Sequence, residues 1–132
     1  MKYVIIGNSA AAVGCIEGIR SIDASGPITV ISDEPYHVYS RPLISYLLYG
    51  MTDEERMKYR PDDFYDKNRV KALLGVKAEK IDTAKKEVIL QGGSCEKYDK
   101  LLIATGSRPF IPPMAGLDTV KRKFTFMKLD DA

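Results

Sequence analysis

Apolar positions in the first quarter of the chain follow two different periods. Short runs rich in β-branched residues occupy positions 3–6 and 28–31, and both runs are typical of strands buried on both faces of a parallel sheet. Between them, apolar residues recur at helical spacing at Ala12, Cys15, Ile16, Ile19 and Ile22. A stripe of minimal side chains, which we expect to pack against a strand, follows the same helix at Ala11, Gly14 and Gly18. Residues 25–27, Ser-Gly-Pro, end the helix, so the segment predicts one right-handed, parallel βαβ unit.

Short elements separated by turns follow in the middle of the chain. The apolar residues 43–49, closed by Gly50, predict a short helix. Residues 52–55 have N-cap and first-turn chemistry, and Pro61 begins a further helix with two aspartates in its first turn. These signals predict short helices in place of a long one.

The pattern turns extended over residues 71–82 and again over residues 87–90, and a glycine pair follows the second run. This arrangement predicts a small antiparallel insertion over residues 76–97. The parallel sheet resumes with the apolar run that begins at Leu101. The predicted fold class is therefore α/β: a Rossmann-like parallel sheet with flanking helices and a small antiparallel β insertion.

The first strand ends in a glycine-bearing turn that opens the helix. Gly7 permits a sharp turn out of the strand, and Ser9 and Ala12 stand where the dinucleotide fingerprint has its second and third glycines. Those positions need small side chains, and Ser9 departs from the pattern by adding a hydroxyl where a pyrophosphate would approach. The N-terminal amides of the helix favour a phosphate. The alternative is that Gly7 only makes a βα turn.

An acidic pair and a second glycine turn add to this loop. Asp33 follows the second strand at the distance where the fingerprint has a carboxylate for a ribose diol; a solvated acidic turn is the alternative. The second turn, residues 104–106, ends the apolar run that begins at Leu101. Two phosphate loops, with Asp33 and Arg41 between them, point to FAD as the nucleotide.

Composition limits the class of protein. The chain has 132 residues, of which 45% are hydrophobic and 29% charged, and its net charge is +2; these values fit one soluble domain and give no nucleic-acid surface. The basic cluster at residues 121–123 is interpreted as a solvated connector in preference to a binding patch. No apolar run approaches the roughly eighteen residues of a membrane span, and the N-terminal run is too short for a signal peptide. We therefore expect a cytoplasmic protein.

The cysteines and the histidine suggest no redox or metal chemistry. Cys15 lies on the apolar face of the predicted helix and is expected in the core. Cys95 lies in a polar turn, and the two cysteines form no C-x-x-C pair. The one histidine, His37, has no histidine or cysteine near it in sequence, so no metal site is predicted.

Taken together, the two loops, the acidic strand end and the segment Tyr-Ser-Arg-Pro-Leu-Ile-Ser at residues 39–45 resemble the FAD-dependent pyridine nucleotide-disulfide oxidoreductases. More narrowly, the chain is similar to the NADH:rubredoxin reductase, ferredoxin reductase and nitrite reductase large-subunit branches. The most specific piece is residues 98–109, where nearly every position fits the second FAD motif of the family. The resemblance covers the whole chain.

The resemblance implies a cofactor site with contributions from much of the chain. The residues that it assigns to FAD are Gly7, Asn8, Ser9, Ala11, Ala12, Asp33, Glu34, Arg41, Ala78, Ala104, Thr105 and Gly106. The first five surround the pyrophosphate. Asp33, assisted by Glu34, holds the adenosine ribose. The Arg41 side chain reaches the flavin side, the Ala78 backbone meets the adenine edge, and residues 104–106 close over the cofactor.

Two departures from the family bear on function. Residues 39–45 contain no redox cysteine, which implies that reduced flavin passes electrons to an external acceptor, either a small redox protein or a small molecule. Many ferredoxin reductases have a lysine where this chain has Tyr46, and that difference leaves the flavin-side electrostatics open.

The resemblance also implies a longer protein. We expect residues 1–110 to be the N-terminal segment of an FAD-binding domain and residues 111–132 to be a connector toward an NAD(P)H-binding domain that is absent here. NAD(P)H would be the co-substrate of the full-length oxidoreductase, and residues 1–132 alone are expected to be inactive. A non-catalytic nucleotide-binding or structural module with a flavoprotein fold is the alternative. The acceptor, the choice between NADH and NADPH, and a homo-oligomeric state stay open.

Overall fold

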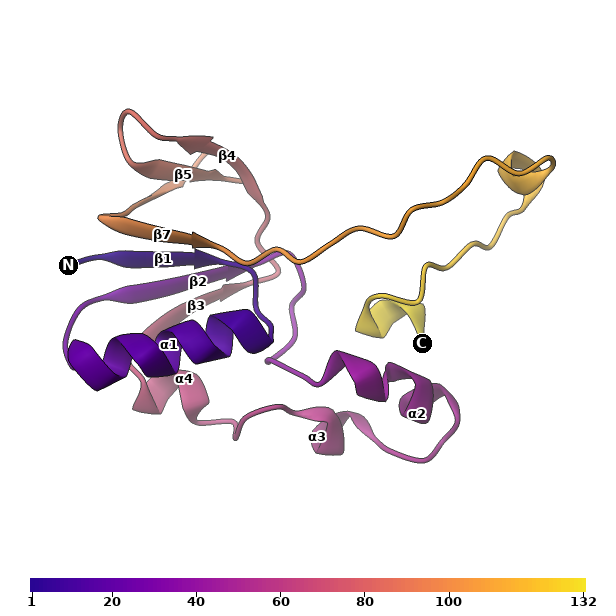
Figure 1. Cartoon of the computed structure of the whole chain (residues 1–132), viewed down its shortest axis with the longest axis horizontal. Helices are drawn as coiled ribbons and strands as arrows, with labels where there is room; N and C mark the ends of the chain where they lie inside the picture. The colour runs from indigo at the N-terminus through magenta and orange to yellow at the C-terminus, as the bar shows by residue number, and fades with distance from the viewer. The chain divides into compact units, whose positions relative to one another are not determined.

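Four parallel strands form the sheet at the centre of this computed structural model, which describes residues 1–132, and their order is β3-β2-β1-β7 (Figure 1). The strands are β1 (Tyr3–Ile6), β2 (Ile28–Ser32), β3 (Val70–Leu74) and β7 (Lys100–Ile103). As predicted, the helix α1 (Ala10–Ile22) connects β1 to β2 in a parallel βαβ unit. The strand β7 lies on the other side of β1, where Tyr3 pairs with Lys100 and Ile6 with Ile103. The outer edge of β7 pairs with no strand.

Both faces of the sheet are covered at β1 and β2, which explains the β-branched runs of these two strands. Ile5 and Val30 pack on the side of α1 and α4 (Phe64–Lys67). Val4 and Ile31, on the opposite face, pack toward a second sheet. That sheet is antiparallel, in the order β4-β5-β6, with β4 (Ala78–Asp82), β5 (Glu87–Leu90) and β6 (Cys95–Lys97). Figure 1 shows α1 and α4 below the parallel sheet and the β4–β5 hairpin above it, so the predicted α/β fold class is confirmed.

The helix α1 buries a different set of residues from the predicted one. Its buried residues are Ala12, Val13, Ile16 and Ile19. Cys15 is only half-buried, and Ile22 is 85% exposed because it ends the helix beyond the sheet. Ala11, Gly14 and Gly18 are exposed, and a Cβ atom added to either glycine would meet no other atom within 4 Å. The prediction that this stripe packs against a strand is therefore wrong.

The extended run predicted over residues 71–82 consists of two strands in different sheets. β3 pairs in parallel with β2, and only β4 belongs to the antiparallel sheet. Gly75, with φ of +73°, turns the chain between them. A register shift between Ala78 and Lys80 then lets Ile81 pack on the core. The antiparallel insertion over residues 76–97 is confirmed, but β3 is an additional parallel strand.

Asp23 closes the loop that follows α1. Its Oδ1 atom accepts hydrogen bonds from the N–H groups of Gly26 (2.7 Å) and Ser25 (3.1 Å), and its Oδ2 atom accepts one from the Tyr3 hydroxyl (3.1 Å). A Cβ atom at position 26 would lie only 2.9 Å from Cγ of Asp23 and 2.8 Å from Cε2 of Tyr3, so a larger residue there would displace these two side chains. The backbone hydrogen bonds from Gly26 and Ser25 lower the pKa of the Asp23 carboxyl.

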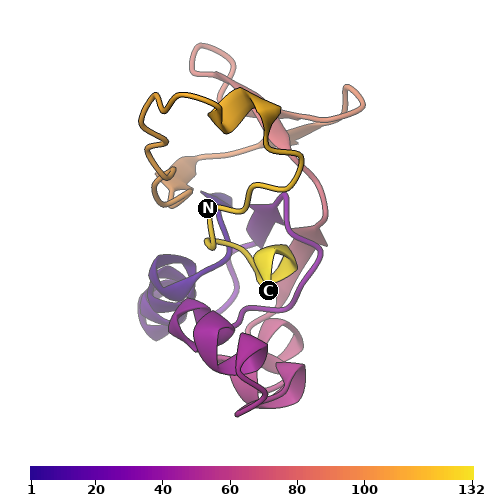
Figure 2. The same cartoon turned by 90° about the vertical axis from the view of Figure 1, so that its right-hand side faces the viewer.

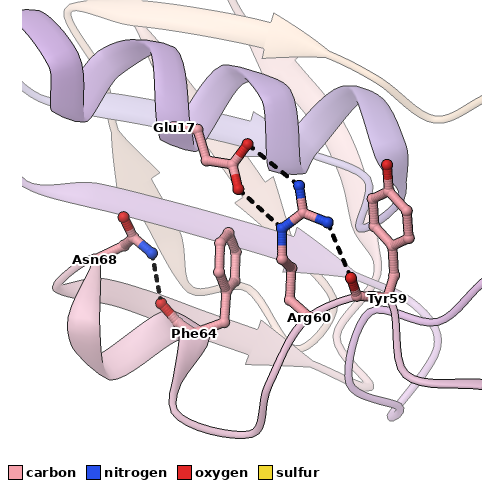
Figure 3. A network of polar contacts seen from close by, with 5 residues as sticks. All are labelled: Glu17, Tyr59, Arg60, Phe64 and Asn68. Atoms are coloured by element: carbon pink, nitrogen blue, oxygen red, sulfur yellow. Dashed lines mark hydrogen bonds and ion pairs between the residues drawn. The ribbon is translucent and has the colours of Figure 1, made fainter. Parts of the chain in front are cut away.

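Arg60 connects the segment before α4 to α1 (Figure 3). Its Nε atom donates to Oε1 of Glu17 at 2.8 Å, and its Nη2 atom donates to Oε2 at 3.3 Å. The Nη1 atom donates to the Tyr59 carbonyl at 2.9 Å, and the guanidinium lies over the Tyr59 ring. Exposed ion pairs contribute about 1 kcal/mol or less, so this bridge mainly orients the segment that leads into α4.

The chain divides into two units. The first comprises Met1–Tyr39 and Lys58–Thr105, and the second comprises Ser40–Met57 and Gly106–Ala132. The helices of the second unit are η1 (Arg41–Leu43), α2 (Ile44–Leu48), α3 (Glu54–Met57), η2 (Leu117–Thr119) and η3 (Leu129–Asp131). The short helices α2 and α3 confirm the elements predicted from residues 43–49 and 52–55, whereas the boundary expected at residue 110 stays a prediction. No helix of the chain is both long enough and apolar enough to cross a membrane.

Candidate functional site

The carboxyl ends of β1 and β7 meet where the strand order of the sheet reverses. From β1 the chain continues to β2 and β3 on one side, whereas β7 lies on the other side. Ligands of open parallel sheets bind beyond the carboxyl ends of the strands at such a switch point, and Figure 2 looks onto these ends. Gly7 follows β1, and Ala104 and Thr105 follow β7. The two loops predicted from the sequence therefore flank the switch point.

Gly7 is required at this point by backbone geometry. Its φ is +114°, and a Cβ atom there would lie 2.6 Å from the carbonyl carbon of Ala104 and 3.2 Å from the nitrogen of Thr105. The Gly7 N–H donates to the Ile31 carbonyl at 2.8 Å, and the Ala104 N–H donates to the Ile6 carbonyl at 2.7 Å. The sheet thus continues into both loops and brings their backbones into contact.

The N-terminus of α1 can accept an anion. Ser9 is the N-cap residue, yet its side chain makes no capping hydrogen bond, and the first turn holds no acidic residue. The first intrahelical hydrogen bond runs from the Val13 N–H to the Ser9 carbonyl, so the preceding N–H groups of α1 have no helical partner. Ser9 has an extended backbone with φ of −143°, which serine adopts without strain. These groups and the helix dipole fit a phosphate.

Ala12 meets the requirement of the third fingerprint position. Its side chain is completely buried between α1 and the sheet. A larger residue would separate the helix from the strand. Ala11, its neighbour in the first turn, is exposed, so it leaves the approach to the N-terminus of the helix open.

The acidic pair at the end of β2 is divided between solvent and core. Asp33 is exposed, whereas Glu34 is only 6% exposed. The Tyr39 hydroxyl donates to Oε2 of Glu34 at 2.7 Å, and the Glu34 N–H donates to Oγ of Ser32 at 3.2 Å. Asp33 is thus the carboxylate of the pair that is accessible from solvent, whereas Glu34 is bonded inside the protein.

Backbone from the end of β3 runs beside this acidic pair. The Gly75 N–H donates to the Glu34 carbonyl at 3.1 Å, and the Val76 N–H donates to the Ser32 carbonyl at 2.8 Å. Ala78, the first residue of β4, follows two positions later and is half-buried. The fold therefore carries Ala78 to the same edge of the sheet as Asp33.

Asn8 uses both polar atoms of its side chain inside the protein. Its Oδ1 atom accepts a hydrogen bond from the Tyr65 hydroxyl at 2.8 Å, and its Nδ2 atom donates to the Tyr36 carbonyl at 3.2 Å. What remains for a ligand at this position is the backbone. Sequence reasoning missed Tyr65, which lies 57 positions away; the only available signal was its place among the apolar anchors of a short helix.

Arg41 and Gly106 belong to the second unit. Arg41 begins η1, and its Nη1 atom donates to the Met127 carbonyl at 2.7 Å. Gly106 has φ of +72°, which favours glycine. Tyr46, at the position where many ferredoxin reductases have lysine, is 48% exposed. The flavin-side role of Arg41 stays a prediction.

Neither cysteine belongs to these loops. Cys15 is half-buried within α1, where burial raises the pKa of its thiol. Cys95 is exposed and begins β6, so the expectation of a turn at this residue is wrong. Both are free thiols.

Comparisons with known proteins match this arrangement. The profile of the family described as pyridine nucleotide-disulphide oxidoreductase matches residues 1–132. Over 131 residues the chain is 39% identical to the epsilon subunit of NADH-dependent phenylglyoxylate dehydrogenase from Aromatoleum evansii; the match covers 99% of this chain and 31% of that subunit.

Two solved structures share the fold. NADH:rubredoxin oxidoreductase from Clostridium acetobutylicum is 27% identical with a TM-score of 0.82, over 98% of this chain and 33% of that one. A chain from the covalent putidaredoxin reductase–putidaredoxin complex is 30% identical with a TM-score of 0.79, over 86% of this chain and 28% of that one. The chain thus spans about a third of the length of these proteins.

Proposed function

The chain belongs to the pyridine nucleotide-disulphide oxidoreductase family, and on this basis we propose that it is the FAD-binding segment of an NAD(P)H-dependent flavoprotein that passes electrons to an external acceptor. The observation that carries the proposal is the contact between two backbone loops at the switch point of the sheet. Gly7 leaves room there only for the backbone of Ala104. A single nucleotide lying across both loops would make use of this contact.

The described residues fit the adenosine half of FAD. The open N–H groups at the start of α1 would donate to the pyrophosphate. The exposed carboxylate of Asp33 would accept hydrogen bonds from the ribose hydroxyls. The backbone at Ala78 lies on the same edge and would border the adenine.

The remaining assigned residues act nearer the flavin. Thr105 and Gly106 would close over the cofactor from the loop after β7. The cationic side chain of Arg41 would oppose negative charge on the pyrophosphate or on the reduced ring. When bound, FAD accepts a hydride from NAD(P)H and releases electrons to the acceptor.

We further propose a small redox protein as the acceptor. The similar structures include a putidaredoxin reductase in covalent complex with putidaredoxin and an NADH:rubredoxin oxidoreductase. Residues 39–45 of this chain contain no cysteine, so a thiol relay within this segment has no donor. A single-electron protein acceptor is consistent with both facts.

The test is the absorbance spectrum of the complete protein after purification. We expect a flavin band near roughly 450 nm, and chromatography of the heat-released cofactor should identify FAD and not FMN. Anaerobic addition of NADH or NADPH should then bleach the band. A well-folded, colourless protein that takes up no added FAD would contradict the proposal and favour a structural or non-catalytic nucleotide-binding module.

A further inference from the structure

The Tyr65 hydroxyl lies between two segments of the proposed nucleotide site. It donates to Oδ1 of Asn8 at 2.8 Å and accepts a hydrogen bond from the N–H of Val38 at 3.2 Å. Asn8 belongs to the phosphate loop, and Val38 belongs to the segment that leaves β2 and carries Asp33. One hydroxyl group therefore bonds to both parts of the chain.

Burial and ring contacts restrict the position of the Tyr65 side chain. Its residue is only 8% exposed in the core beside α1. The ring packs edge-on against Phe64, with centroids 5.6 Å apart, and tilted against His37, at 4.8 Å. Burial raises the pKa of the hydroxyl, so the group stays protonated and able to donate to Asn8.

A second hydrogen bond connects the Asn8 side chain to the segment after β2 without passing through Tyr65. Nδ2 of Asn8 donates to the carbonyl of Tyr36, a residue of the same segment that carries Asp33. The Asn8 side chain is thus attached to this segment directly, through Tyr36, and indirectly, through Tyr65 and Val38. Both polar atoms of the Asn8 side chain are therefore bonded to residues outside the phosphate loop.

We infer that Tyr65 is a positioning residue for the nucleotide: through Asn8 it fixes the phosphate loop relative to the segment that presents the ribose carboxylate. The inference rests on the proposed function, because it concerns the same site. Tyr65 need not touch the ligand. Its effect on affinity comes from keeping the pyrophosphate donors and Asp33 at the spacing that one nucleotide requires, so that this spacing is not rebuilt at each binding event.

The experiment compares Tyr65→Phe with Tyr3→Phe in the complete protein. Each change removes one hydroxyl that bonds to a polar side chain, but the Tyr3 hydroxyl bonds to Asp23 at the amino end of the sheet, away from the proposed site. FAD affinity of the apo-protein is measured by quenching of flavin fluorescence, and stability is measured by thermal unfolding. We expect Tyr65→Phe to weaken FAD binding about tenfold, the effect of losing one or two hydrogen bonds, and Tyr3→Phe to leave it within about twofold.

Asn8→Ala and the double variant extend the test to the coupling itself. Asn8→Ala should weaken FAD binding at least as much, because it removes the bond to Tyr36 as well as the bond from Tyr65. The double variant should bind FAD about as well as Asn8→Ala alone, since the path through Tyr65 is already broken in that variant. Additive losses, or a Tyr65→Phe protein that melts earlier yet binds FAD as tightly as the wild type, would overturn the inference and leave the proposed function standing. A wild-type protein that binds no FAD would overturn both.

Discussion

The backbone of Gly7 touches the backbone of Ala104, with no space for a side chain between them. These residues stand at the ends of neighbouring parallel strands, and each also bonds to the strand beside it. Since φ of Gly7 is +114°, any other residue would meet both backbone strain and a collision. The contact defines the floor of the proposed cofactor site.

Gly7→Ala should therefore destabilise the protein and impair FAD binding. We expect a loss of roughly 2–4 kcal/mol in the free energy of unfolding, because strained φ and a backbone collision occur together. The matched control is Gly14→Ala in α1, where the new Cβ meets nothing within 4 Å and a gain of about 0.5–1 kcal/mol is expected. Urea unfolding measures both; a Gly7→Ala protein as stable as the wild type would contradict the geometry.

Asp33→Ala should weaken FAD binding by about 1–3 kcal/mol, the scale of lost hydrogen bonds to a charged group. The fold should survive, because the side chain is exposed. Glu79→Ala, another exposed carboxylate on β4, serves as the control and should bind FAD as the wild type does. Calorimetry with apo-protein measures the affinities, and unchanged affinity in Asp33→Ala would remove the ribose assignment.

The Asp23 carboxyl should make stability depend on acid pH. Its pKa in the folded state is lowered by the N–H groups of Gly26 and Ser25, so its contribution is present above the unfolded pKa of about 4 and is lost as the pH falls through the folded value. Asp23→Asn should abolish this part of the acid loss. Side-chain NMR titration of Asp23 gives the folded pKa directly, and a value at or above the ordinary one would refute the prediction.

Neither cysteine should take part in turnover. Cys95 is exposed, whereas burial raises the pKa of Cys15, so Ellman's reagent should modify Cys95 much faster. The double variant Cys15→Ala, Cys95→Ser of the complete protein should oxidise NAD(P)H with an artificial acceptor within about threefold of the wild-type rate. A hundredfold loss, on the order expected for a missing catalytic group, would reveal a thiol relay.

Residues 1–132 expressed alone should self-associate. The edge strand β7 has no outer partner, and its Ile103 is 60% exposed; open apolar edges promote pairing between copies. Ile103→Lys should reduce the association seen by light scattering, while Lys100→Ala on the same strand should not. A wild-type piece that is entirely monomeric would contradict this expectation.

Residues 1–132 should also fail to oxidise NADH. NADH should not bleach the absorbance of FAD added to this piece, since hydride transfer requires the nicotinamide to be held near the flavin. Rapid bleaching would contradict this prediction.

The pattern of apolar residues was sufficient to predict the strands and helices whose apolar positions are clearly periodic or continuous. The runs in β1 and β2 are almost fully buried, so their apolar character marks them plainly. The apolar pattern does not separate β3 from the strand that follows, because β3 lies at the edge of the sheet and Val70 is its only buried residue. The exposure of Gly14 and Gly18 could not be derived either, since small residues allow close packing but do not require it.

The residues of the candidate site also fall into two groups, those placed by sequence spacing and those placed by contacts between distant parts of the chain. Gly7 and Asp33 follow strands directly, so their place at the carboxyl edge could be predicted from spacing. The role of Asn8 could not, because its side-chain partners Tyr36 and Tyr65 lie 28 and 57 positions away. Glu34 is adjacent to Asp33, yet only the three-dimensional contact with Tyr39 shows that it points into the protein.

The pairing of β1 with β7 also governs when the site can exist during synthesis. Tyr3 pairs with Lys100, and closing a loop of this length costs roughly 4 kcal/mol in chain entropy. At ordinary translation rates, roughly 5–20 s pass between the emergence of the first phosphate loop and that of the second. During that interval β1 has one uncovered edge, and no cofactor can bridge the two loops. A nascent chain should therefore acquire its flavin only after β7 has paired with β1, and until then one edge of β1 is open to pairing with other chains.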